Sequence, residues 1–208
     1  MAIRIRSTTE PFESAGPEAV REAVGAILLA EAMGLLSEDD PVERLDLEAV
    51  RRVARAANRA GIGAAPTAAL AARRLPPGEL RTALRGLREA LEDSPAPTAE
   101  WSGLVRLFGA DVLARLVSVS PVSLRRYVSG SRPTPDAVAA RVHFLARVVA
   151  ELRGAYNDVG VRRWFDRKRT LLRGRSPAQV LKGQWTPENA NAQRVLELAR
   201  SLAFSPAT

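Results

Sequence analysis

Apolar residues recur along this chain mostly at the three- and four-residue spacing of one helical face. Three stripes stand out: Val20, Val24, Ile27 and Leu28; Val138, Val142, Leu145, Val149 and Leu152; and Val195, Leu198 and Leu202. Strict alternation, which is typical of a half-buried strand, occurs only from Ala2 to Arg6, a stretch short enough to be an unstructured arm instead. The pattern predicts an all-α fold.

A recurring pair of residues, in which a small polar residue or glycine precedes proline, marks the expected helix starts. It occurs at six places: Gly16-Pro17, Asp40-Pro41, Ser120-Pro121, Thr134-Pro135, Ser176-Pro177 and Thr186-Pro187. An oxygen-bearing side chain can accept from the first free N–H groups of a helix, and proline in the first turn loses no hydrogen bond. Each pair therefore predicts the start of a helix.

The segment from Asp93 to Thr98 contains two prolines and no helical stripe, and it is the best candidate for a domain boundary. We divide the chain into a helical region over 1–95, a middle region over 96–155 and a C-terminal helical segment over 156–208. In the first region, arginine-rich helices are expected over 45–60 and 77–91, joined through Gly61-Ile62-Gly63. No motif there indicates a role.

The net charge of +8 is unevenly distributed. Residues 1–100 carry 13 arginines against 16 acidic residues, a balance of −3, whereas residues 101–208 carry 18 lysines and arginines against 7 acidic residues, a balance of +11. Such asymmetry suggests that the second half meets a polyanion. A solvated basic surface would give the same count.

The most specific pattern lies between residues 110 and 133. Two short helices are expected over 110–117 and 121–129, joined by three residues, with Ser120 capping the second helix and Gly130 ending it. The positions expected to point inward are Leu113, Leu116, Val117, Val119, Leu124 and either Tyr127 or Val128. This arrangement predicts a helix-turn-helix.

The stretch Leu-Ala-x-Leu-x-x-Val-Ser-x-x-x-Leu-x-x-Tyr-x-x-Gly-x-Arg-Pro, from Leu113 to Pro133, resembles the Xre-type family of helix-turn-helix regulators. The resemblance covers about residues 100–153 and implies a homodimer that binds double-stranded DNA. It implies base contacts from Pro121, Val122, Arg125 and Arg126, where arginine can pair with guanine and valine can pack on a thymine methyl group. It implies phosphate contacts from Ser118, Ser120, Ser123, Ser131 and Arg132.

The C-terminal segment is similar to the toxin-binding domain of the Xre/MbcA/ParS antitoxins. The matching residues are Trp164, Leu172, Gly174, Pro177, Leu181, Gly183, Val195 and Leu198. The resemblance implies a RES-type toxin partner, an NAD-consuming enzyme whose cleft the antitoxin plugs. Trp164 is expected to anchor the core, whereas Trp185, beside Gly183 and Gln184, is the candidate for an exposed partner-binding anchor. The long N-terminal region and the basic stretch over 162–169 depart from the family.

Catalytic chemistry finds little support in the sequence. The chain has no cysteine, and its single histidine, His143, lies within an apolar helical pattern next to Phe144. No phosphate-binding, nucleophile-elbow or metalloprotease motif occurs, and Glu38-Asp39-Asp40 looks like an acidic helix start rather than a metal loop. We expect no enzymatic activity, cofactor or metal.

Two functions remain open at this point. The first is a sequence-specific transcriptional regulator of antitoxin type that represses its own gene. The second is an interaction protein that neutralises a RES-type toxin and uses the helix-turn-helix only as a scaffold. The chain has no signal-peptide pattern, and its apolar runs, such as Ala26 to Ala30, are too short to span a membrane. We therefore expect a cytoplasmic protein associated with the nucleoid.

Overall fold

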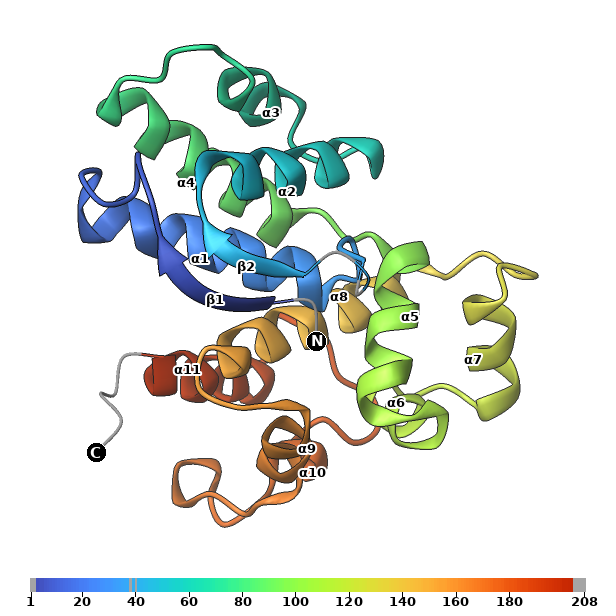
Figure 1. Ribbon diagram of the computed structural model, residues 1–208. Coiled ribbons are helices and arrows are strands. Elements are labelled where there is room, and N and C mark those ends of the chain that lie inside the picture. The colour runs from blue at the N-terminus through green and yellow to red at the C-terminus, as the bar shows by residue number, and fades with distance from the viewer. Residues whose placement is uncertain (1–2, 38, 40, 204–208) are drawn as a thin grey trace. The chain divides into compact units, whose positions relative to one another are not determined.

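A computed structural model describes residues 3–37, 39 and 41–203 of the chain (Figure 1). The chain divides into two compact units, Met1–Ser94 and Pro95–Thr208. The division falls inside the segment from Asp93 to Thr98, and residues 96–155 and 156–208 belong to the same unit. Expectations for Ala2, Glu38 and Asp40 lie outside the described residues.

The all-α expectation is confirmed, because 65% of the chain is helical and 6% is strand. The first unit contains β1 (Ile3–Thr8), α1 (Gly16–Ala32), β2 (Val42–Leu45), α2 (Leu47–Arg59), α3 (Ala64–Leu70) and α4 (Pro77–Asp93). The second contains α5 (Pro97–Phe108), α6 (Ala110–Leu116), α7 (Pro121–Val128), α8 (Asp136–Arg153), α9 (Asp158–Asp166), the 3-10 turn η1 (Thr170–Leu172), α10 (Pro177–Val180) and α11 (Ala190–Ala203).

The first unit opens with a β-α-β arrangement, of which the sequence offered only the first strand, as one of two alternatives for the stretch ending at Arg6. Strands β1 and β2 are parallel, with Ile3 opposite Val42 and Thr8 opposite Leu45, and α1 forms the crossover. The prediction of a helix start at Asp40-Pro41 is wrong, because Pro41 leads into β2. The following helix is capped instead by Asp46, whose carboxylate accepts from the N–H of Ala49 at 2.7 Å.

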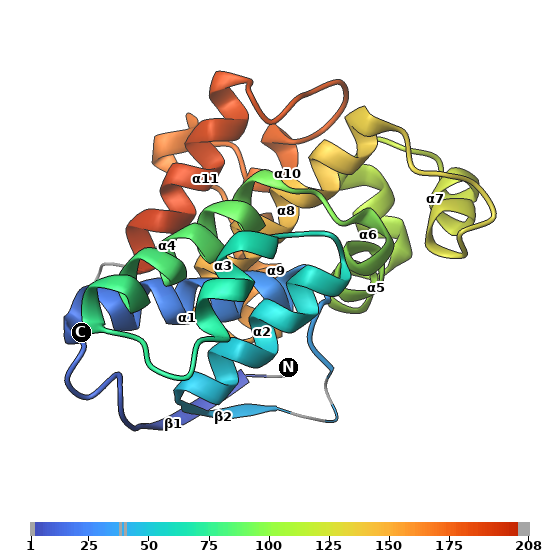
Figure 2. The ribbon, with the colours of Figure 1, turned by 90° about the horizontal axis from the view of Figure 1, so that it is seen from above.

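Helices α1 and α4 pack against each other in this unit, and α3 packs on α2 and α4 (Figure 2). Helix α4 contributes a fully buried leucine row, made of Leu80, Leu84, Leu87 and Leu91. Helix α1 buries Ile27 and the small side chains Ala19, Ala23, Ala26 and Ala30, whereas Val20, Val24 and Leu28 are only half-buried. The apolar face predicted for α1 is therefore displaced by one position. The segment Gly61-Ile62-Gly63 does not join the two arginine-rich helices directly, as expected, but leads into α3, which lies between them in the chain.

The second unit is built around α8, which contacts α5, α9 and α11. The predicted stripe on this helix is confirmed at Val142, Leu145, Val149 and Leu152, all of which are buried, and Val138 is half-buried. Helix α11 covers α8 with Val195, Leu196 and Ala199. None of the helices in the described part of the chain is long and apolar enough to cross a membrane.

The cap-proline pairs of the second unit give mixed outcomes. Ser120-Pro121 and Ser176-Pro177 begin α7 and α10, and each serine hydroxyl accepts from a backbone N–H three residues later. Helix α8 begins one residue after Thr134-Pro135. Thr186-Pro187 forms a turn, in which the side-chain oxygen of Asn189 accepts from the N–H of Thr186 at 2.7 Å. Helix α11 begins only at Ala190.

Candidate nucleic-acid interface

Helices α6 and α7 are joined by a tight turn whose backbone closes the end of α6. The N–H of Val119 donates to the carbonyl of Ala114 at 3.0 Å, and that of Ser118 donates to Arg115 at 3.3 Å. This Schellman pattern places Ser118 at a φ of 57°, where glycine is usually found. Ser120 then caps α7, with its Oγ 3.0 Å from the N–H of Ser123. The predicted cap at Ser120 is confirmed.

The outer face of α7 carries the residues that sequence analysis assigned to base contacts. Leu124 and Tyr127 are buried, whereas Pro121, Val122, Arg125 and Arg126 are exposed, with Val122 at 49%. Within the described part of the chain, neither guanidinium has a hydrogen bond or an ion pair. In Figures 1 and 2, α7 lies at the edge of its unit, next to α5 and α6. The structure thus brings these four residues together on one open helical face.

The inner face of α7 is fixed by aromatic contacts. Tyr127 stacks on Trp101 of α5, with 5.9 Å between ring centroids and 18° between planes. The indole N–H of Trp101 donates to the hydroxyl of Thr134 at 2.9 Å. Arg132 follows the end of α7, and its guanidinium lies 5.8 Å from the Tyr127 ring centroid, in a cation–π contact.

The serines predicted to contact phosphates have hydrogen bonds within the chain. The Oγ of Ser118 donates to the carbonyl of Gly183, and that of Ser120 caps α7. The Oγ of Ser131 donates to the carbonyl of Arg126 at 3.3 Å, at the end of α7. The Oγ of Ser123 lies 3.0 Å from that of Ser120. These hydroxyls shape the turn and both ends of α7, and their contact with phosphates stays a prediction.

The carbonyl groups that end α6 are held from the other side by two side chains. The indole N–H of Trp185 donates to the carbonyl of Leu116 at 3.0 Å. Arg141 of α8 donates to Val117 at 3.1 Å and to the carbonyl of Trp185 at 2.7 Å, and its guanidinium lies 5.9 Å from the Trp185 ring centroid. The last carbonyls of a helix lack partners within the helix, and here two of them accept from Trp185 and from Arg141 of α8.

The prediction that Trp185 is an exposed anchor is therefore wrong. Its side chain is 5% exposed and meets Phe144 edge to face, with 5.3 Å between centroids. Its neighbours Gly183 and Gln184 are exposed, which is why the local sequence indicated a surface position. Trp164, expected in the core, is indeed buried.

A buried hydrogen-bonded pair of side chains and a buried arginine were not predicted from the sequence. Glu100 of α5 is fully buried, and its Oε1 lies 2.6 Å from Nδ1 of His143 on α8, which is 5% exposed. Arg141 is also buried. The available signal was their position, because Arg141 and His143 flank Val142 of the predicted apolar stripe. Polar residues in such a place usually have a buried partner.

A second basic surface, which we term the basic loop, spans residues 167–175. Its backbone is closed by the antiparallel bridge between Arg169 and Arg175, and its tip exposes Leu171 at 73%. The guanidinium of Arg169 lies 5.5 Å from the Trp164 ring centroid. Its pKa is lowered mainly by burial and secondly by the nearby charge of Arg167. Arg167, Lys168, Arg173 and Arg175 are exposed and form no ion pair within the described ranges. The loop thus concentrates positive charge without a carboxylate.

The described residues contain no group of three histidine, cysteine, aspartate or glutamate side chains placed to hold a metal ion. Comparisons of the chain with protein-family models, with curated proteins and with solved structures gave no match, so the geometry of α6, α7 and their surroundings is what bears on function.

Proposed function

We propose that this protein binds double-stranded DNA sequence-specifically through α7 and acts as a transcriptional regulator. The observation that carries the proposal is the outer face of α7, where Arg125 and Arg126 have unused guanidinium donors beside the exposed Val122. Arginine can donate two hydrogen bonds to the O6 and N7 atoms of guanine in the major groove, and valine can pack on a thymine methyl group. The fixed inner face of α7 holds these groups in place.

The charge around α7 supports the same proposal. Between Asp111 and Asp136 the sequence has no acidic residue, whereas it has Arg115, Arg125, Arg126 and Arg132. An uncompensated run of cations attracts the phosphate backbone at long range, which increases the rate of encounter and contributes the salt-dependent part of the affinity. In this proposal Arg132, which lies beside Tyr127 past the end of α7, contacts a phosphate.

We further propose that two copies bind together and that the target includes the protein's own promoter, as for a repressor of antitoxin type in the bacterial cytoplasm. A two-fold dimer matches an operator of two half-sites about one DNA turn apart. Sedimentation of the protein with and without a selected operator measures this stoichiometry. Neutralisation of a RES-type toxin has less support, because Trp185, its expected anchor, makes contacts inside the unit.

Selection of binding sequences from a random duplex library tests the DNA-binding proposal directly. We expect the parent to enrich one motif and the double variant Arg125→Ala/Arg126→Ala to enrich none. The control Arg194→Ala, which removes an exposed arginine from α11, should enrich the same motif as the parent. Circular dichroism establishes that each variant is folded. A parent that enriches no motif, or a folded double variant that enriches the parent's motif, would overturn the proposal.

A further inference from the structure

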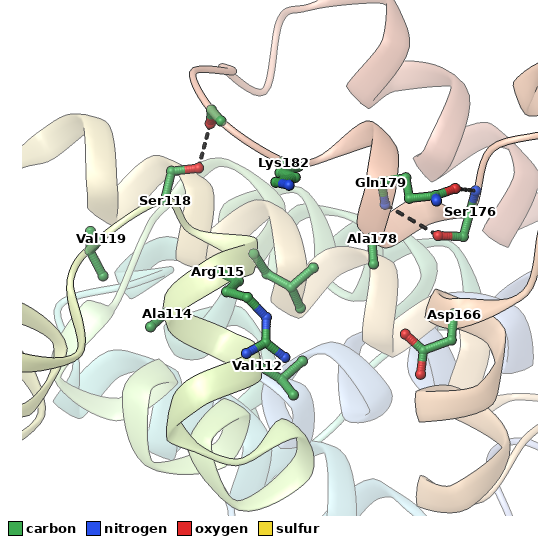
Figure 3. A pocket seen from close by; sticks show the side chains of 12 residues that line it. Val112, Ala114, Arg115, Ser118, Val119, Asp166, Ser176, Ala178, Gln179 and Lys182 are labelled. Atoms are coloured by element: carbon green, nitrogen blue, oxygen red, sulfur yellow. Dashed lines mark hydrogen bonds between the residues drawn. The ribbon is translucent and has the colours of Figure 1, made fainter.

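A groove of about 670 Å³ lies beside the turn between α6 and α7 (Figure 3). One wall is formed by α6 and the turn, and the other by the end of α9, by α10 and by the residues that follow α10. The volume falls within the range of about 300–1,000 Å³ that is typical of sites for small organic molecules. All of the lining residues belong to the second unit.

The walls of the groove are mainly apolar. Val112, Leu116 and Val119 line it from α6 and the turn, and Ala178 lines it from α10. Val112, Val119 and Ala178 are half-buried, so a ligand resting on them would remove apolar surface from water. This composition favours a ligand with a hydrocarbon body.

Three charged side chains line the same groove: Arg115 of α6, Lys182 after α10 and Asp166 at the end of α9. All three are exposed, and none of them has an ion pair or side-chain hydrogen bond within the described ranges. Figure 3 shows Arg115 and Asp166 on different walls, with Lys182 above them in this view. The other polar groups drawn there already have partners: Ser118 donates to Gly183, and Ser176 and Gln179 cap each other. The unused charge is therefore two cations against one carboxylate.

We propose that this groove binds a small organic anion that has an apolar body and one carboxylate, sulfonate or phosphate group. The apolar body lies on Val112, Leu116 and Ala178, and the anionic group pairs with Arg115 and Lys182. Arginine suits this role because its guanidinium can donate two parallel hydrogen bonds to a planar or tetrahedral oxyanion.

The position of the groove couples the ligand to α7, and this step rests on the proposed DNA-binding function. Ser118 and Gly183 both line the groove, and the hydrogen bond between them connects the turn before α7 to the C-terminal segment. A ligand that contacts both sides of this bond favours one arrangement of the turn. It therefore changes the affinity of α7 for DNA, and DNA changes the affinity for the ligand by the same factor.

Fluorescence titration with anilinonaphthalene sulfonate, which combines an aromatic body with one sulfonate, tests the site without DNA. We expect saturable binding of one equivalent by the folded protein. The double variant Arg115→Gln/Lys182→Gln should bind about tenfold more weakly, because it loses charge-assisted hydrogen bonds. Ala178→Trp should fill the groove and abolish binding, whereas the control Arg194→Gln should bind like the parent.

Competition on the parent protein tests the charge requirement even if a variant fails to fold. Octanoate should displace the dye at about tenfold lower concentration than octanol, which has the same chain without the charge. Equal displacement by the two competitors, the absence of saturable binding, or unchanged affinity in both folded groove variants would overturn the proposal.

The failure of this site and the failure of the DNA-binding function are distinguishable. Dye binding without selection of any DNA motif leaves the site standing and removes the regulator. Selection of a motif without dye binding removes the site and leaves the regulator. If both occur, octanoate should shift the affinity of the parent for the selected motif, and an unchanged affinity would overturn the coupling alone.

Discussion

The two sides of the α6–α7 pair differ in how their polar groups are used. On the inner side, Arg141, Trp185 and the carbonyls of Leu116 and Val117 all have partners at 2.7–3.1 Å. On the outer side, Arg125 and Arg126 have unused donors. The difference teaches that charge alone does not identify a binding residue, because the buried Arg141 and the exposed Arg125 belong to the same basic unit. An inner substitution should act on stability, and an outer one on DNA affinity.

The largest effect is expected from Trp185→Ala. Loss of a buried tryptophan removes its packing and leaves the carbonyl of Leu116 without a donor, so the free energy of unfolding should fall by about 3–5 kcal/mol. Chemical denaturation measures this loss. Trp185→Phe is the matched control, because it keeps an aromatic ring and removes the N–H donor, and it should cost about 1–3 kcal/mol. A Trp185→Ala protein as stable as the parent would contradict the inner role of this residue.

A somewhat smaller loss is expected from Arg141→Met. Methionine preserves much of the side-chain bulk but leaves the carbonyls of Val117 and Trp185 without their donor, and each buried unsatisfied group costs about 1–3 kcal/mol. The free energy of unfolding should fall by about 2–4 kcal/mol on this basis. The control Arg194→Met makes the same change at an exposed arginine of α11 and should leave the free energy of unfolding unchanged. Unchanged stability in Arg141→Met would show that these bonds do not hold the turn.

The outer arginines should show the opposite behaviour. Arg125→Ala and Arg126→Ala should each weaken binding to the selected DNA motif by about 1–3 kcal/mol, while binding to random DNA falls much less. Both proteins should unfold at the denaturant concentration of the parent, because neither guanidinium has a hydrogen bond or an ion pair with any residue that the structure describes. If affinity falls equally for motif and random DNA, these side chains contact phosphates rather than bases.

The smallest effect is expected from Arg132→Ala. This arginine should position the protein on the phosphate backbone, so its loss should weaken binding to all sequences alike and lower the slope of log affinity against log salt concentration by about one unit. Titration of motif and random DNA at several salt concentrations measures both quantities. Arg132→Lys keeps the charge and should restore the slope. A loss confined to the selected motif would instead make Arg132 a base-reading residue.

Local chemistry made part of this structure predictable from sequence. Ser120-Pro121 and Ser176-Pro177 lie at real helix starts. They could be predicted because the capping hydrogen bond joins residues only three positions apart. Asp40-Pro41 misled because the four residues after it pair with a strand almost forty positions earlier. Pairing over such a distance leaves no mark in the window around Pro41. The short strand β2 could therefore not be recognised from its own sequence.

The same limit explains the outcome at the site. The exposed face of α7 followed from helical spacing, since Leu124 and Tyr127 define the buried side and the other residues fall opposite. Trp185 could not be placed in this way, because its partners Leu116 and Arg141 lie 69 and 44 residues away in the chain. Gly183 and Gln184 suggested an exposed segment, and both residues are exposed, but they gave no information about where the Trp185 indole lies.

The hydrogen bonds from Trp185 to Leu116 and from Ser118 to Gly183 bear on how the chain folds during its synthesis. The acceptor carbonyl of α6 is synthesised 69 residues before its indole donor, and Ser118 emerges 65 residues before Gly183. In a nascent chain that stops before Gly183, the hydroxyl of Ser118 and the carbonyl of Leu116 lack these partners. The turn that presents α7 is therefore completed only after residue 185 has left the ribosome. The second unit should therefore acquire its final form as one body after residue 185 has been synthesised, rather than as a preformed α6–α7 pair to which the C-terminal segment is added.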